Sequence, residues 1–186
     1  MSTDVIKRLF TVRDFHRMVD AGILAEHDRV ELIRGEVITM SPIGPPHSAI
    51  VDRINRAMVR AAGDEAIVRV QSNVELSEYN EPEPDIVLMR PRDDFYYSAL
   101  PAPADIFLIV EVSDSSIRYD RGLKAELYAE TGIPEYWVVD VKNRRVFAYS
   151  DPQGQEYRVV REFSSGDVVS PRLLPNCAVA VASMVG

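Results

Sequence analysis

The sequence predicts a domain of the α/β (α+β) class, in which a strand, helix, strand crossover is combined with antiparallel strands. The 186 residues are 46% hydrophobic and 27% charged, a composition typical of one globular domain with a sizeable core. Residues 106–141 follow the pattern strand, helix, strand, and residues 145–182 alternate short apolar segments with turn sequences. We therefore expect a single domain over residues 1–186, with flexible ends at 1–10 and 183–186.

Helices and a hairpin are expected in the first third of the chain. Thr11 and Asp14 can cap a helix that extends to Ala21. A hairpin over residues 29–40 reverses at Arg34-Gly35, where glycine tolerates a positive φ. After a proline-rich loop at 41–46, apolar residues recur at helical spacing from 47 to 62 and leave a basic outer face that carries Arg53, Arg56 and Arg60.

Strands dominate the middle of the chain. Apolar segments at 66–77, 85–89 and 106–113 are the expected central strands, and a long loop at 91–103 separates the last two. A helix is expected over 116–130, closed by Thr131-Gly132 and followed by a strand over 135–141. This last strand and the strand at 106–113 would lie parallel in the sheet, because a helix connects them.

The sequence argues against export and against a membrane span. Its longest apolar run, Ile106 to Val110, is much shorter than the roughly 20 residues that cross a bilayer. The amino terminus lacks the features of an export signal, and a single cysteine, Cys177, excludes an internal disulfide framework. We therefore expect a cytoplasmic protein with no membrane contact. Its formal charge of −8 weakens non-specific attraction to polyanions.

Two carboxylates stand inside otherwise apolar strands. Asp85 opens one expected strand, and Glu111 lies near the carboxyl end of another. Burial of an ionised carboxylate is costly unless a cation or several donors receive it. Paired side by side, the two would present hard oxygen ligands to one Mg²⁺ ion, which takes one or two protein carboxylates and completes its shell with water or phosphate oxygens. The alternative is that each carboxylate caps a backbone group or pairs with an arginine.

Lys124 adds a cationic group whose position along the expected helix is similar to that of Glu111 along its strand. It stands about eight residues into the expected helix, roughly 12 Å along the axis. Glu111 is two residues back from the strand end, roughly 7 Å. Once the turn is included, the lysine stem could place its ammonium group beside the carboxylates, to position water or stabilise phosphoryl charge. The alternative is a solvated helix face that Lys124 shares with Arg118 and Arg121.

The pattern Pro84-Asp85, then Glu111-Val112-Ser113, then Lys124 resembles the active-site signature of the PD-(D/E)XK nuclease superfamily. In particular the chain resembles the bacterial Uma-type family of restriction-endonuclease-like proteins, over roughly residues 10 to 180. Four stretches share the order and spacing of that family: residues 31–36, 81–85, 124–129 and 132–140. The resemblance implies a restriction-endonuclease-like central mixed sheet flanked by helices, with a metal at the mouth of the central strands.

One position departs from that superfamily. Its members usually place the lysine two residues after the glutamate, where this chain has Ser113. The resemblance implies that Lys124 has taken over the lysine function. It also implies that Glu31 is an additional acid near the metal, although in a hairpin Glu31 could equally be a surface charge.

Two more residues are candidates for substrate binding. Gln71 lies on the expected strand before the signature and could orient water or substrate. His47 opens a helix beside the proline-rich loop, where a histidine is more often a cap or a surface donor than a base.

The sequence therefore predicts a Mg²⁺- or Mn²⁺-dependent endonuclease that hydrolyses phosphodiester bonds. Asp85 and Glu111 would be the metal ligands, Glu31 an auxiliary acid and Lys124 the electrostatic group. DNA is the expected substrate by family analogy, and a homodimer would suit an enzyme that cuts both strands. The alternative is a weakly active or inactive binding or regulatory module with the nuclease fold, which the net charge favours. A carboxylate-pair glycosidase would leave the lysine unexplained.

Overall fold

The computed structural model describes residues 6–25 and 27–186, so part of the flexible start expected at 1–10 lies outside the described residues. The chain divides into two compact units. The smaller unit comprises Met1–Pro42 and Glu75–Pro82, and the larger comprises Ile43–Val74 and Glu83–Gly186. No helix among the described residues is both long enough and apolar enough to span a bilayer.

The smaller unit holds helix α1 (Val12–Asp20) and the hairpin of β1 (Val30–Ile33) with β2 (Glu36–Thr39). Thr11 and Asp14 form the expected capping box at the start of α1. The hairpin turns at Arg34 and Gly35, with φ values of 50° and 75°. A Cβ atom on Gly35 would lie 2.6 Å from the Cβ of Leu9, so the position requires glycine for space as well as for conformation.

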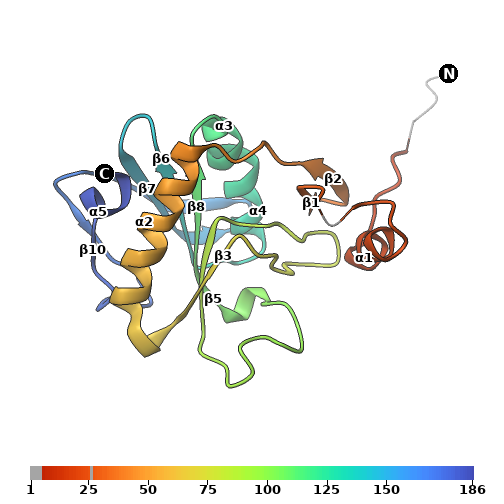
Figure 1. Cartoon of the computed structure of the whole chain (residues 1–186), viewed down its shortest axis with the longest axis horizontal. Coiled ribbons are helices and arrows are strands. Elements are labelled where there is room, and N and C mark those ends of the chain that lie inside the picture. The colour runs from red at the N-terminus through yellow and green to blue at the C-terminus, as the bar shows by residue number, and fades with distance from the viewer. Residues whose placement is uncertain (1–5, 26) are drawn as a thin grey trace. The chain divides into compact units, whose positions relative to one another are not determined.

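The larger unit is built on a six-stranded mixed sheet with the order β3-β4-β5-β6-β7-β8 (Figure 1). The strands are β3 (Ile67–Val70), β4 (Ile86–Met89), β5 (Ile106–Ser113), β6 (Glu135–Asp140), β7 (Arg145–Gln153) and β8 (Glu156–Ser164). Only β5 and β6 pair in parallel, and every other neighbouring pair is antiparallel. The crossover expected between 106 and 141 is therefore confirmed, as is the mixed sheet with additional antiparallel strands.

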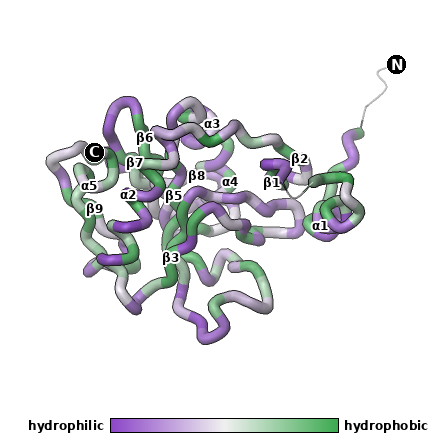
Figure 2. Tube along the Cα trace, in the orientation of Figure 1, coloured by the Kyte–Doolittle hydropathy of each residue, from purple (hydrophilic) through white to green (hydrophobic). Residues whose placement is uncertain are grey.

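Helices cover both faces of this sheet. Helix α2 (Pro45–Ala62) crosses one face, as Figure 1 shows, and packs Ile54 and Met58 onto Leu88, Leu108 and Val110. Figure 2 shows hydrophobic and hydrophilic residues alternating along the same helix. The crossover helix lies on the opposite face and has three parts: α3 (Ile117–Tyr119), a π-helical turn η3 (Asp120–Lys124) and α4 (Ala125–Glu130).

Short elements complete the larger unit. They are two 3₁₀ turns, η1 (Gly63–Glu65) and η2 (Pro103–Asp105), the small antiparallel pair β9 (Val168–Val169) and β10 (Val179–Ala180), and helix α5 (Val181–Val185). Helix α5 corrects the prediction of a flexible end at 183–186, because Met184 and Val185 are buried in the core. A five-residue helix is too short for a periodic pattern to reveal it.

The strand expected at 66–77 is shorter than predicted. Strand β3 ends at Val70, because Gln71 has a left-handed φ of 43° that extended backbone does not allow. The backbone N–H of Gln71 still donates to the carbonyl oxygen of Asp85 at 3.0 Å. The chain therefore leaves the sheet beside the first residue of the nuclease-like signature.

A matched pair of substitutions tests how much the central strands contribute to stability. Val138 on β6 is fully buried, whereas Val160 on β8 is 50% exposed. We expect Val138→Ala to lower the free energy of unfolding by about 2 kcal/mol, since it removes buried methyl groups. Val160→Ala should change it by less than about 0.5 kcal/mol. Urea unfolding measures both, and equal losses would contradict this account of the core.

Candidate functional site

Asp85 and Glu111 lie next to each other where β4 begins and β5 approaches its carboxyl end. The register pairs Ile86 with Val110, and one further step places Asp85 opposite Glu111 on the same face of the sheet. The backbone N–H of Val112 donates to Oδ2 of Asp85 at 2.8 Å, and that of Asp85 donates to Oε2 of Glu111 at 3.3 Å. Both carboxylates are buried, so backbone donors hold the pair in place.

Lys124 reaches this pair from the crossover helix. Its Nζ donates to Oε1 of Glu111 at 3.0 Å, and the hydroxyl of Tyr128 donates to the same oxygen at 2.8 Å. The side chains of Lys124 and Glu111 are only 4% and 8% exposed. The alternative of a solvated helix face for Lys124 is therefore excluded, and the three side chains of the signature converge, as their estimated positions along the strand and the helix predict.

The local sequence explains how the helix presents Lys124. Asp120, Lys124 and Tyr128 are spaced four residues apart, so they follow one side of the helix. Asp120 accepts hydrogen bonds from the hydroxyls of Ser113 and Ser116, which attaches the start of the helix to the end of β5. The π turn over 120–124 inserts an extra residue in that region, a feature that is frequent at functional sites.

Burial raises the pKa of the Asp120 carboxyl, against the lowering effect of the two serine hydroxyls and of Lys124. Because the pKa of Asp120 is raised in the folded state, the contribution of this group to the free energy of unfolding is largest below the ordinary pKa of aspartate. It is lost as pH rises through the pKa of the folded state. Serine hydroxyls can also accept from an amide, so Asp120→Asn keeps these contacts. We expect the free energy of unfolding of Asp120→Asn, relative to that of wild type, to increase as pH increases from 4 to 8. Urea unfolding across this range measures it, and a difference independent of pH would contradict the assignment.

His47 and Gln71 both lie beside Asp85. Nε2 of His47, in the first turn of α2, is 3.1 Å from Oδ2 of Asp85, and the imidazole is 16% exposed. His47 is therefore a neighbour of the carboxylate pair and not a surface group. Gln71 contacts Asp85 through its backbone, and its side chain is partly buried.

Glu31 lies on β1 in the smaller unit, whereas Asp85 and Glu111 belong to the larger unit. Its residue exposure is 2%, which excludes the alternative of a surface charge in an exposed hairpin. The same unit also holds a buried glutamate that the sequence reasoning did not single out. Glu81 is 2.6 Å from Nε2 of His16, and its backbone pairs with Leu32 next to Glu31.

Asp85 and Glu111 are the residues that could hold a divalent ion. Among the residues that the structure describes, no group of three or more His, Cys, Asp or Glu side chains is arranged to bind a metal. Two neighbouring carboxylates nevertheless suit Mg²⁺, which takes most of its ligands from water and phosphate. Carboxylate oxygens also suit Mn²⁺. The donor set therefore fits one hard ion, with Lys124 as a neighbouring positive charge.

Tyr128 and Asp120 are site residues that the sequence reasoning missed. The signal that could have identified them was the four-residue spacing on both sides of Lys124. Tyr136 and Trp137 are fully buried core residues, and Cys177 is buried and free.

Comparison with known structures identifies the class of fold. The structure is similar to a crystal structure from Anabaena variabilis ATCC 29413, described as a "putative nuclease belonging to DUF820", with a TM-score of 0.72 and 16% sequence identity. The alignment covers 95% of this chain and 97% of the other. The molecule therefore has the mixed-sheet fold of that nuclease group.

The family model described as "Uma2: Putative restriction endonuclease" matches residues 12–182. The chain belongs to this Uma2 family, which confirms the resemblance seen in the sequence. A comparison with curated proteins gives no match.

Proposed function

We propose that this protein is a Mg²⁺- or Mn²⁺-dependent endonuclease that hydrolyses phosphodiester bonds in DNA. One observation carries the proposal. Asp85 and Glu111 lie side by side at the ends of the neighbouring strands β4 and β5, and the ammonium group of Lys124 donates a hydrogen bond to Glu111. A structural ion pair with Lys124 needs only Glu111, whereas here a second buried carboxylate, Asp85, lies beside it and is held by the N–H of Val112 and the ring of His47. The family description points to the same class of enzyme.

Each side chain then has a distinct role. Asp85 and Glu111 would hold the ion, which when bound supplies Lewis-acid stabilisation of phosphoryl charge and an activated water. Lys124 would place positive charge beside the phosphate in a site from which most water is excluded, where electrostatic stabilisation is strong. Tyr128 and the N–H of Val112 would keep the two carboxylates in orientation.

The remaining candidates would act around this centre. His47 would contact the substrate or fix the orientation of Asp85, since its ring nitrogen already faces that carboxylate. Gln71 would contribute to substrate positioning next to Asp85. Glu31 would be an auxiliary acid, and its burial supports this role because a buried carboxylate is not a surface charge.

A binding or regulatory module with little turnover is the second candidate. The formal charge of −8 favours it, because such a charge disfavours long-range attraction to DNA. A nicking assay on supercoiled plasmid distinguishes the two candidates. The enzyme should convert plasmid to open-circular or linear form with Mg²⁺ or Mn²⁺ and stop when EDTA is added, whereas the module should bind without cleavage.

A further inference from the structure

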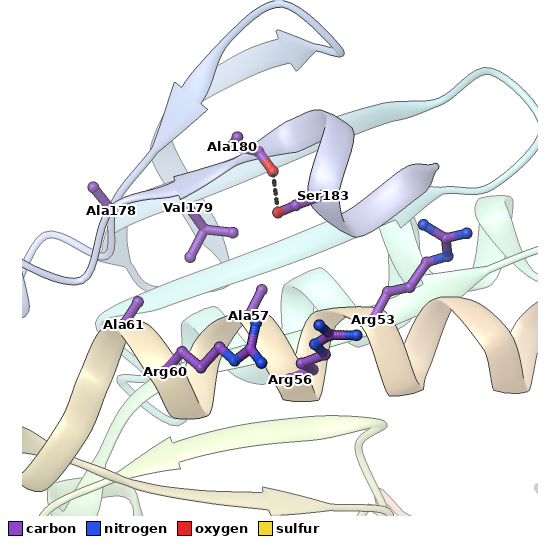
Figure 3. Close-up of a pocket in the computed structure, with 9 residues that line it drawn as sticks. All are labelled: Arg53, Arg56, Ala57, Arg60, Ala61, Ala178, Val179, Ala180 and Ser183. Carbon is purple, nitrogen blue, oxygen red and sulfur yellow. Dashed lines mark hydrogen bonds between the residues drawn. The ribbon is translucent and has the colours of Figure 1, made fainter.

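A groove of about 520 Å³ runs along the outer side of α2, at some distance from the carboxylate pair. One wall is α2, and the other is formed by β10 and the start of α5, as Figure 3 shows. Arg53, Arg56 and Arg60 line the α2 wall, and Val179 and Ser183 are among the residues across from them. Both walls belong to the larger unit.

The three arginines form a short positive row. At about 100° per residue, their positions on α2 fall within about 60° of one another, and they extend over about 10 Å of the axis. All three side chains are exposed. Among the described residues that line the groove, none is an aspartate or a glutamate. In a chain with a net charge of −8, this row concentrates positive charge where no lining carboxylate offsets it.

The rest of the lining indicates which part of a ligand would fit. Both walls also carry small residues, among them Ala57, Ala61, Ala178 and Ala180, and none of the described residues that line the groove is aromatic. Bases bound by proteins commonly stack on aromatic rings, whereas phosphates are bound by guanidinium groups. The lining therefore suits a sugar-phosphate backbone and offers no platform for a base.

We infer that this groove binds successive backbone phosphates of a nucleic acid, outside the bond that is cleaved. The assignment of the ligand as substrate rests on the proposed nuclease function. Arg53 and Arg60 are about 9 and 20 Å along the helix from His47, the residue of α2 that contacts Asp85. That span corresponds to roughly six base pairs at 3.4 Å per step. The groove thus gives a negatively charged protein a local attachment point for a long substrate.

The salt dependence of binding tests the inference. The variant Arg53→Gln/Arg56→Gln/Arg60→Gln removes three charges from the groove and leaves the carboxylate pair intact. Fluorescence anisotropy with a labelled 30-base-pair duplex in EDTA measures affinity without cleavage. Three lost phosphate contacts should weaken binding about tenfold or more at low salt. They should also make the plot of log K against log salt concentration shallower by about 2.7, since each contact contributes about 0.9.

A matched variant controls for net charge. Arg13→Gln/Arg144→Gln/Arg158→Gln removes three exposed arginines that do not line the groove, and it should keep the wild-type slope. Equal slopes for the groove variant and wild type, or no binding of duplex by wild type, would overturn the inference. Displacement of the duplex by polyglutamate at equal charge would also overturn it, because the groove would then accept an acidic protein as readily.

A small substrate separates this inference from the proposed function. Bis(p-nitrophenyl) phosphate is too short to span the groove and the carboxylate pair, so the groove variant should hydrolyse it at the wild-type rate while it cleaves plasmid with a raised KM. Loss of both activities in the groove variant would overturn the inference. Failure of wild type to hydrolyse either substrate, with a normal change in salt slope, would instead contradict the nuclease proposal.

Discussion

Asp85→Asn is expected to reduce the rate of plasmid cleavage at least about 10³-fold. Metal assistance is worth several kcal/mol of transition-state stabilisation, and about 1.4 kcal/mol corresponds to a factor of ten. The amide keeps the shape of the side chain and one oxygen for the N–H of Val112, which now donates to Asp85 at 2.8 Å. The fold should therefore persist while the negative charge needed by the ion is lost.

A control of the same chemistry is Asp64→Asn, since Asp64 is an exposed residue of η1. This variant should cleave at the wild-type rate. The assay is the initial rate of plasmid nicking in Mn²⁺, combined with thermal unfolding to establish that each variant is folded. If wild type and Asp85→Asn cleave equally, the activity comes from a contaminating nuclease and the assignment of Asp85 is wrong.

Substitution of Lys124 should affect stability and activity in separable ways. Lys124→Met removes the ammonium partner of the buried Glu111 carboxylate and is expected to lower the free energy of unfolding by about 3–5 kcal/mol. In the double variant Lys124→Met/Glu111→Gln the charge on Glu111 is also gone, so most of that loss should be recovered. Both variants should cleave at least about 10²-fold more slowly than wild type, because loss of one electrostatic donor alone typically costs about 10²–10³ in rate.

The comparison forms a double-mutant cycle when Glu111→Gln is added. Urea unfolding gives the coupling free energy between the two side chains, and plasmid nicking gives the activity of each variant. A stable double variant without activity would show that these two side chains are needed for cleavage beyond their contribution to stability. Full cleavage by Lys124→Met, or recovery of cleavage in the double variant, would contradict the role assigned to Lys124.

Much of the fold follows from local sequence patterns. The capping box of Thr11 and Asp14, the turn at Arg34 and Gly35, and the apolar run Ile106–Val110 that begins β5 are all encoded within a few neighbouring residues. Convergence of the site could also be predicted, because strand pairing and helix rise fix where Asp85, Glu111 and Lys124 lie along their elements.

Features that depend on distant contacts could not be predicted in this way. The left-handed Gln71 ends β3 early, although Val74 and Leu76 after it keep the alternating pattern of a strand. The short helix α5 owes its position to burial of Met184 and Val185, and the close approach of Leu9 to Gly35 joins segments that no periodicity connects. Tertiary packing decides these positions, and a single sequence carries little of that information.

The central claim is that Asp85 and Glu111 together hold a divalent ion. A crystal soaked in Mn²⁺ and measured for anomalous scattering tests it most directly. The account predicts a peak within about 2.1 Å of an oxygen of each carboxylate, the distance expected for octahedral ligands of this kind. A map in which manganese lies elsewhere, with Lys124 alone occupying the space beside both carboxylates, would contradict it.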